Sequence, residues 1–428
     1  MKKVLIITYY WPPSGGAGVQ RWLKFAKYLP EYGYQPIIYT PENPEFPAFD
    51  ESLLKDIPEG ITVLKQPIWE PYNWYRQFLG QKDKKIGAGF VSEKKEPGLL
   101  HKVSVWVRGN FFIPDARKFW IKPSVQYLTK YLQENPVDAV VSTGPPHSMH
   151  LIALELKKRL NINWIADFRD PWTNIDFYKE LMLSSWADSK HRQLEKQVLA
   201  KADSVVTIGY TMTKEMEELG AKRVETITNG FDEDDFPETQ ARLDTEFSIS
   251  HIGTFSPTRN HPKFWQALAE LKTENQAFAN ALKVRTVGVV DHHVAASMEQ
   301  AGLSENWERI DYVSHDKVLE YQRSSRVLLV SINDSPNATG ILPGKFFEYL
   351  ASGRPILAIG PKQSDIGTVL SKTKAGIIVE KDDLEEMKQA ILTLFEENQN
   401  LQRNETEIAK FSRRGLTRQM VELLNSLA

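Results

Sequence analysis

Residues 337–361 read NATGILPGKFFEYLASGRPILAIGP and set out one structural unit of the fold. A loop broken by glycine and proline leads into a short segment whose apolar residues recur at helical spacing. A Gly-Arg-Pro turn then opens an apolar run that is typical of a buried strand. A helix followed directly by such a strand predicts a parallel α/β sheet.

The same alternation of apolar runs and helical patterns extends over the whole chain. A length of 428 residues exceeds one ordinary core and suits two domains of roughly 200 residues each. An acidic, turn-rich stretch at residues 228–236 separates two series of expected strands. Each half is therefore predicted to be a doubly wound, Rossmann-like domain. The expected strands are 4–9, 36–40, 61–65, 139–142, 164–167, 204–208 and 224–227, and then 247–252, 283–290, 309–313, 327–332, 355–359 and 376–379.

The composition excludes several classes of protein. A formal net charge of −2 gives no overall field to recruit nucleic acid. The chain has no cysteine, which excludes disulfides and cysteine metal sites and suits the cytosol. No apolar run approaches the roughly 18 residues of a membrane span, and the N-terminal run reads as a first buried strand. A cytoplasmic protein is expected.

Lys345 and Glu348 lie three residues apart at the start of the helix predicted within residues 337–361. A helix N-terminus attracts phosphate through its dipole and its unpaired N–H groups. The lysine adds a positive charge, and the carboxylate can accept hydrogen bonds from both hydroxyls of a ribose. These groups suit a nucleotide diphosphate, although an ordinary ion pair on one helix face would have the same spacing.

The stretch PGKFFEYLASGRPILA resembles the donor-nucleotide motif of GT-B glycosyltransferases, in particular glycosyltransferase family 4. The resemblance implies that Glu348 binds the ribose and that Lys345 contacts the diphosphate. The first glutamate of the family motif would fall at Gly340. Donor-sugar contacts would then come from the backbone N–H groups of Gly340, Ile341 and Leu342.

A glycine-rich loop at residues 14–18 follows the first expected strand, where backbone can approach a phosphate closely. A dinucleotide fingerprint would need a further glycine where Arg21 stands and an acidic residue where Thr40 stands, which argues against NAD. The family resemblance instead implies that Gly15 and Gly16 lie against the donor phosphate and the acceptor.

The loop at residues 253–260 opens the second expected domain and resembles the family's phosphate-binding loop. The resemblance places Gly253 and Arg259 at the leaving diphosphate, with Thr254 replacing an arginine of the motif. One guanidinium can still bind two phosphate oxygens. The alternative is that Arg259 is a surface cation.

Two strand ends in the first half carry polar residues that match the acceptor side of the family. Asp170 is the candidate for positioning or deprotonating the acceptor hydroxyl, and Arg169 for binding an acceptor anion. His147 is the candidate for a hydrogen bond to the donor sugar or the acceptor. Alternatively, Asp170 caps a helix that begins near Pro171, and His147 caps and packs.

The acidic run at residues 232–235 invites a metal interpretation. The resembling family stabilises its leaving group without a metal, so we expect no metal and no other cofactor.

Residues 68–130 interrupt the first domain and mix aromatic residues with cations. This composition suits an anionic membrane surface or a lipid-diphosphate acceptor, with Trp106 and Trp120 as the membrane contacts. The alternative is that these aromatics pack on the domain.

Together these features predict a GT-B fold, two Rossmann-like domains facing a cleft. Residues 1–228, joined by a last helix at 408–428, would form the acceptor side, and residues 229–407 the donor side. The resemblance implies a metal-independent hexosyltransferase. It would transfer a sugar, with retention, from a nucleotide-diphosphate-sugar to a saccharide or lipid-linked acceptor, in cell-surface polysaccharide or glycolipid synthesis on the inner face of the membrane. The alternatives are a nucleotide-sugar epimerase of the same fold and a catalytically silent sugar-binding protein.

Overall fold

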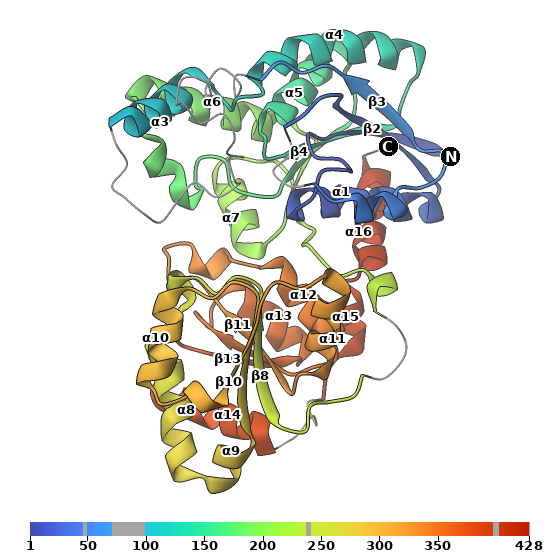
Figure 1. Ribbon diagram of the computed structural model, residues 1–428. Helices are drawn as coiled ribbons and strands as arrows, with labels where there is room; N and C mark the ends of the chain where they lie inside the picture. The colour runs from blue at the N-terminus through green and yellow to red at the C-terminus, as the bar shows by residue number, and fades with distance from the viewer. Residues whose placement is uncertain (46–48, 71–98, 237–240, 397–401, 428) are drawn as a thin grey trace. The chain divides into compact units, whose positions relative to one another are not determined.

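A computed structural model describes residues 1–45, 49–70, 99–236, 241–396 and 402–427. The chain divides into two compact units (Figure 1). Unit 1 comprises Met1–Thr228 together with Leu416–Ala428, and unit 2 comprises Asn229–Gly415.

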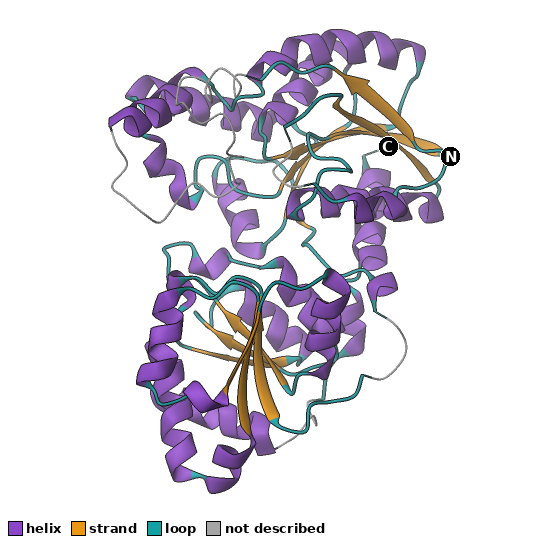
Figure 2. Ribbon diagram, viewed as in Figure 1, coloured by secondary structure: helices purple, strands orange, loops and turns teal. Residues whose placement is uncertain are grey.

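Unit 1 is built on a seven-stranded parallel sheet with the order β3-β2-β1-β4-β5-β6-β7. The strands are β1 Lys2–Ile7, β2 Tyr34–Pro41, β3 Thr62–Gln66, β4 Ala139–Gly144, β5 Trp164–Phe168, β6 Ser204–Thr207 and β7 Val224–Thr226. Helices cover the sheet (Figure 2). They are α1 Ala17–Tyr28, α3 Leu99–Phe111, α4 Lys118–Glu134, α5 Ser148–Leu160, α6 Ser185–Lys201, α7 Tyr210–Glu218 and α16 Arg413–Ser426.

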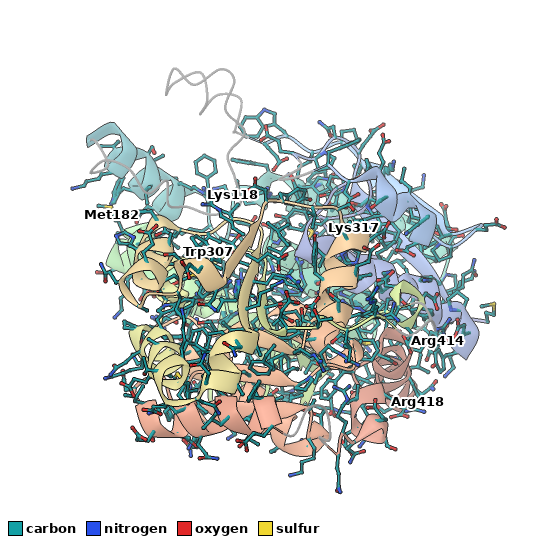
Figure 3. All side chains as sticks on the ribbon, turned by 60° about the horizontal axis from the view of Figure 1, so that its bottom comes forward. Lys118, Met182, Trp307, Lys317, Arg414 and Arg418 are labelled. Atoms are coloured by element: carbon teal, nitrogen blue, oxygen red, sulfur yellow. The ribbon has the colours of Figure 1, made fainter. Side chains whose placement is uncertain are left out.

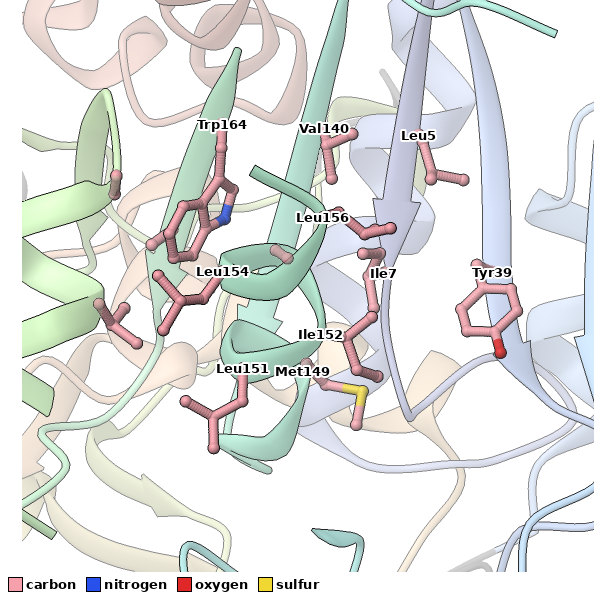
Figure 4. Close-up of a cluster of buried hydrophobic side chains, with 14 of the residues drawn as sticks. Leu5, Ile7, Tyr39, Val140, Met149, Leu151, Ile152, Leu154, Leu156 and Trp164 are labelled. Carbon is pink, nitrogen blue, oxygen red and sulfur yellow. The ribbon is translucent and has the colours of Figure 1, made fainter. Parts of the chain in front are cut away.

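Alternating side chains of the strands enter two cores, one on each face of this sheet. In β1, Leu5 and Ile7 belong to one buried cluster, whereas Val4 and Ile6 belong to the other. Figure 4 shows the first cluster, in which apolar residues of α5 pack on the strands. A sheet buried on both faces explains why its strands read as continuous apolar runs.

Unit 2 is built on a six-stranded parallel sheet with the order β10-β9-β8-β11-β12-β13. The strands are β8 Phe247–Ile252, β9 Leu282–Val287, β10 Trp307–Ile310, β11 Val327–Ser331, β12 Ile356–Ile359 and β13 Gly376–Val379. The helices are α8 Pro262–Glu274, α9 Gln276–Ala281, α10 His292–Gln300, α11 His315–Ser324, α12 Gly344–Ala351, α13 Asp365–Thr373, α14 Leu384–Glu396 and α15 Glu405–Ala409.

Every expected strand overlaps a strand of the structure, which confirms two doubly wound parallel sheets. The run 283–290 extends three residues past β9, which ends at Val287. Gly288 has a φ of +110°, and a Cβ there would lie 3.2 Å from the carbonyl oxygen of Gly253. The chain must turn at this glycine, so the apolar residues beyond it are not part of the strand.

The last helix was expected to be continuous, and this expectation is wrong. The structure has α15 and α16, separated by three residues around Phe411. The N–H of Phe231 donates to the carbonyl of Phe411, and the N–H of Arg413 donates to the carbonyl of Phe231. Because these backbone groups pair with Phe231, they cannot continue a helical ladder.

The expected insertion at residues 68–130 divides into parts with different roles, and residues 71–98 lie outside the described residues. Trp120 was expected at a surface but is only 1% exposed, with its ring stacked on Tyr39 at 4.9 Å. Trp106 is 41% exposed. No helix in the described part of the chain is long and apolar enough to cross a membrane.

Candidate functional site

Each sheet has one point where the strand order reverses, and ligands of such sheets bind at the carboxyl ends of the strands there. In unit 1 this point lies between β1 and β4, and in unit 2 between β8 and β11. The loops after these strands and helix α12 carry most of the predicted site residues, whereas Arg169 and Asp170 follow β5, the strand beside β4. The two groups are described separately.

Lys345, at the start of α12 in unit 2, lies among other basic groups. Its Nζ is 2.8 Å from Nε2 of His251 and donates to the carbonyl oxygen of Ile252 at 3.1 Å. Burial, followed by the charge of the nearby Arg259, lowers the pKa of Lys345 to about 7. An anion at this position would therefore stabilise the charged form of the lysine.

His251, near the end of β8, was missed by sequence reasoning. Burial, followed by the charges of Lys345 and Arg259, holds its pKa well below the ordinary value. The ring is thus neutral, and it stacks on Phe255 at 4.1 Å. Its Nδ1 is buried with no hydrogen-bond partner among the described residues. A histidine near the carboxyl end of a strand is the one signal that could have found it.

Arg259 is held between the loops that follow β8 and β11. Its Nε donates to Oδ1 of Asn333 at 2.6 Å, and its Nη1 donates to the carbonyl of Thr254 at 3.0 Å. Burial lowers the pKa of Arg259, yet a guanidinium stays charged in proteins. Gly253, with a φ of +101°, starts the turn that carries this arginine.

Glu348 lies one turn after Lys345 on α12 and is partly buried. Burial raises the pKa of Glu348, while a hydrogen bond from Gln322 opposes this rise. The Nε2 of Gln322, on α11, donates to Oε2 of Glu348 at 2.7 Å. Gln322 is fully buried and was also missed, because no local pattern links α11 to α12.

The backbone before α12 is partly used within its own turn. The N–H of Gly340 donates to the carbonyl of Asn337, and the N–H of Ile341 donates to that of Ala338. These bonds form the short 3-10 turn Ala338–Gly340. Of the three N–H groups expected to contact a donor sugar, the structure thus pairs two, and Leu342 is the remaining candidate.

Arg169, which follows β5 in unit 1, is buried and bound by backbone. Its Nη1 donates to the carbonyl of Gly18 at 2.8 Å, and its Nη2 donates to the carbonyl of Pro145. A Cβ on Gly18 would lie 2.7 Å from this Nη1, so a larger residue there would displace the guanidinium. The arginine therefore ties the glycine-rich loop, with Gly15 and Gly16, to the loop after β4.

His147 is in the loop after β4 and packs flat against Trp172, with ring centroids 4.6 Å apart. Burial, followed by the charge of other nearby rings and of Arg169, holds the pKa of His147 well below its ordinary value. It occupies the N-cap position of α5 but makes no side-chain capping bond. The ring is a neutral hydrogen-bonding group in a rigid setting.

Asp170 is exposed at the carboxyl end of β5. The alternative that it caps a helix beginning near Pro171 is wrong, because the next helical turn is the 3-10 segment Asp176–Leu181. Its neighbour Asp167 is completely buried. Asp167 pairs with Arg21 at 2.8 Å, an ion pair that sequence reasoning missed.

The acidic run at residues 232–235 is occupied by structural bonds. Asp232 accepts a hydrogen bond from the N–H of Asp234, and Asp234 pairs with Arg414 at 3.1 Å. The group of residues among those described that could hold a metal ion is elsewhere, at Asp291, His292 and His293. There Asp291 caps α10 by accepting from the N–H of His293 at 2.9 Å.

The fold is a two-unit α/β architecture with a basic and an acidic side chain, Lys345 and Glu348, on the helix that follows β11. Two family models match the chain. The one described as "Glycosyl transferases group 1" matches residues 246–397, and the one described as "Glycosyltransferase Family 4" matches residues 89–235. Together these ranges cover more than half of the chain, which belongs to the group 1/family 4 glycosyltransferases. It is therefore an enzyme of a family that uses nucleotide-sugar donors.

Solved structures of similar fold span the full chain. Sucrose-phosphate synthase from Thermosynechococcus elongatus has a TM-score of 0.62 and 14% identity, covering 100% of this chain and 99% of its own. A trehalose-6-phosphate structure from E. coli with bound UDP-2-fluoro glucose has a TM-score of 0.60 and 12% identity, covering 99% and 98%. The lipopolysaccharide outer core galactosyltransferase WaaB has a TM-score of 0.60 and 12% identity, covering 100% of both chains.

At these identities the structural likeness shows the GT-B fold alone. A search among curated proteins finds no match to the chain.

Proposed function

We propose that the enzyme transfers a sugar from a nucleotide-diphosphate-sugar to a saccharide or lipid-linked acceptor, in the synthesis of a cell-surface polysaccharide or glycolipid. The observation that carries this proposal is the cluster of Lys345, Arg259 and His251 in unit 2. Three basic side chains lie together there, while Glu348 stands one helical turn away. A diphosphate with an attached ribose is the ligand whose chemistry matches both features.

In the proposed complex, Glu348 accepts hydrogen bonds from the ribose, and Lys345 and Arg259 contact the diphosphate. Breaking the sugar–phosphate bond adds negative charge to the diphosphate. Fixed cations that await this charge stabilise the transition state more than the ground state. The N-terminus of α12 adds its dipole in the same sense. Gly253 and the backbone N–H of Leu342 complete the proposed donor contacts, since the N–H groups of Gly340 and Ile341 are paired within their own turn.

In unit 1 we propose that Asp170 positions or deprotonates the acceptor hydroxyl and that neutral His147 donates or accepts a hydrogen bond with a sugar. Gly15 and Gly16 would allow close approach to phosphate and acceptor. Because its terminal nitrogens already bind carbonyls, Arg169 is better suited to positioning this loop than to binding an acceptor anion. Retention of configuration rests on the family resemblance, and NMR of the product's anomeric proton would test it.

The nature of the acceptor is supported by what similar structures are named for. One is described as a glycosyltransferase involved in lipopolysaccharide biosynthesis, and WaaB is a lipopolysaccharide galactosyltransferase. Such acceptors are built on lipids, so we propose that this enzyme works in the cytoplasm, at the inner face of the membrane.

The direct test is a thermal-shift screen of UDP-, GDP- and dTDP-sugars, followed by transfer assays with lipid-linked and free saccharides. A ligand that binds the native state raises its melting temperature. Glu348→Ala should remove the shift, because a charged acceptor is worth about 1.5 to 3 kcal/mol. Glu320→Ala, on the exposed side of α11, is the matched control. Turnover of donor without acceptor would favour an epimerase, and binding without any turnover a silent sugar-binding protein.

A further inference from the structure

Large apolar side chains that reach solvent are concentrated in unit 1. Among the described residues, unit 2 exposes only Val289 and Tyr312 in this class. Unit 1 exposes many more, and eight of them come from α3, from the start of α4 and from two segments near these helices. We call this set the α3 face: Trp69, Val103, Trp106, Val107, Phe111, Phe119, Met182 and Trp186. Single exposed apolar residues are ordinary, whereas a gathered set marks an interaction surface.

Hydrogen bonds hold two parts of the α3 face side by side. The Nδ2 of Asn110 donates to the carbonyl of Met182 at 3.2 Å, and its Oδ1 accepts from the N–H of Ser184 at 2.7 Å. The segment that carries Met182 and Trp186 is thereby fixed against the end of α3. Met182 has a φ of +52°, uncommon for a side chain of its size. Its side chain is nevertheless 45% exposed, so burial does not explain this backbone conformation.

Aromatic contacts continue the α3 face to the start of α4. Trp69 and Phe119 meet edge to face at 4.9 Å, and Trp106 meets Phe111 at 5.8 Å. Lys118 joins the two pairs, because its Nζ donates to the carbonyl of Phe111 at 2.6 Å and lies 5.2 Å from the ring of Phe119. Figure 3 labels Lys118 and Met182 on this surface.

The charge around α3 and the start of α4 is positive. Between residues 99 and 133 the only acidic residue is Asp115. Its carboxylate accepts hydrogen bonds from the backbone N–H and the hydroxyl of Ser148. The same stretch holds six lysines and arginines, among them the exposed Lys102 and Lys122. Lys102 lies one helical turn from Trp106, and Lys122 lies one turn from Phe119, so the exposed cations border the exposed rings.

We propose that the α3 face docks unit 1 on an anionic lipid bilayer. Aromatic rings settle at the level of the lipid headgroups, and lysines are attracted to the negative surface. The absence of a spanning helix among the described residues makes this a peripheral contact. The positive charge of residues 99–133 is the reason to choose lipid over a second copy of the chain, whose own residues 99–133 would repel it. The proposal deepens the proposed function by placing the enzyme where a lipid-linked acceptor lies, but it does not depend on the donor.

The test is flotation of the full chain with vesicles of phosphatidylcholine, alone or mixed with phosphatidylglycerol, without donor or acceptor. We expect binding to the mixed vesicles and little to neutral ones. Lys102→Gln with Lys122→Gln should weaken binding about fivefold per lysine at low salt. Trp106→Ser with Phe111→Ser should lower the vesicle binding that remains at high salt at least about tenfold.

Tyr312→Ser and Lys317→Gln make matched changes in unit 2, where Tyr312 is 88% exposed, and should bind vesicles like the unmodified protein. Each variant is first checked for an unchanged melting temperature. If the aromatic pair disturbs folding, the lysine pair still tests the surface.

Three results would overturn the proposal. The first is that the protein does not bind anionic vesicles at low salt, and the second is that all variants bind them equally. The third is that the protein binds no vesicles but associates with itself, and that Trp106→Ser with Phe111→Ser abolishes this self-association. Failure of the donor screen would leave the flotation result standing, so the two proposals fail separately.

Discussion

The surroundings of Lys345 disfavour its charged ammonium form, and a bound diphosphate would favour it. Its pKa is lowered to about 7 by burial and by Arg259. A diphosphate stabilises the ammonium, so donor binding should raise this pKa and take up a proton. Below about pH 7 the free enzyme is already protonated, and affinity should be flat. Above it, affinity should fall by up to about tenfold per pH unit.

Calorimetric titration of a nucleotide sugar across this pH range measures the effect. Lys345→Arg should bind with a flat profile, since arginine stays charged throughout. A flat profile in the unmodified enzyme would rule out Lys345 as the diphosphate contact.

Gln322 is the residue that should set the affinity of the proposed ribose carboxylate. Gln322→Leu keeps the volume but removes the hydrogen bond to Glu348, whose pKa should then rise further. We expect donor affinity to fall about tenfold, the value of one hydrogen bond to a charged group, and to fall more steeply as the pH is lowered. The control is Gln276→Leu, which makes the same change at an exposed residue of α9. An unchanged pH profile for Gln322→Leu would mean that Gln322 has only a packing role.

Arg259 and Lys345 should matter more for the transition state than for donor binding. Arg259→Ala and Lys345→Ala are each expected to lower kcat by about 10²-fold or more, with a smaller change in donor Kd. Steady-state transfer rates and equilibrium titration together separate the two effects. Lys317→Ala, on α11, changes a cation that pairs with Glu320 at the surface and should leave both constants unchanged. Equal losses in kcat and in affinity would point to uniform binding instead.

At the scale of elements, the strands could be predicted because they are buried on both faces and read as apolar runs. The end of β9 could not, since it depends on backbone geometry at Gly288, and neither could the break between α15 and α16, which depends on pairing with Phe231. Lys345 and Glu348 could be found because both lie on α12, within one local motif. His251 and Gln322 come from β8 and α11, and only the order of the strands brings them to α12.

The difference between local pattern and folded contact also explains why only one of the two tryptophans, Trp106 and Trp120, was placed correctly at a surface. Composition shows that aromatics and cations occur together, but it does not show which side of each helix faces the sheet. Trp120 turns inward to Tyr39, whereas Trp106 reaches solvent.

The ion pair between Arg21 and Asp167 joins α1 to the end of β5. Both side chains are buried, and Arg21 also donates to the carbonyls of Ile227 and Thr228, the last residues of this part of unit 1. Burial alone would raise the pKa of Asp167, but Arg21 and neighbouring donors hold it below its ordinary value.

Removing the carboxylate of Asp167 leaves the charge of Arg21 buried without its ion-pair partner. Asp167→Ala should therefore lower the free energy of unfolding by about 3 to 5 kcal/mol, as measured by urea denaturation. Lys158→Ala, which breaks the exposed pair with Glu155, should cost only about 0 to 1 kcal/mol. A loss for Asp167→Ala as small as that of the control would show that this buried pair does not stabilise unit 1.

At the scale of the whole molecule, charge acts locally. The formal net charge of −2 provides no general attraction for an anionic donor or an anionic membrane. Both proposed contacts instead rest on cations gathered in one place, Lys345 and Arg259 in unit 2 and, in unit 1, Lys102 and Lys122 beside the α3 face. Since exposed charges are screened by salt and partly buried ones much less, vesicle binding should be the more salt-sensitive of the two.

The last prediction concerns metal ions and the charge of the leaving diphosphate. A metal that bridged a diphosphate would need carboxylates around it, but among the described groups the one carboxylate that acts on Lys345 is Glu348, which is bound to Gln322. Lys345 and Arg259 already supply the positive charge that a metal would bring. Transfer by the full chain should thus persist in EDTA, and Mg²⁺ or Mn²⁺ should add little to the initial rate. If transfer strictly required either ion, and if Asp291→Ala abolished the response to that ion, the charge of the diphosphate would instead be stabilised at the group of Asp291, His292 and His293.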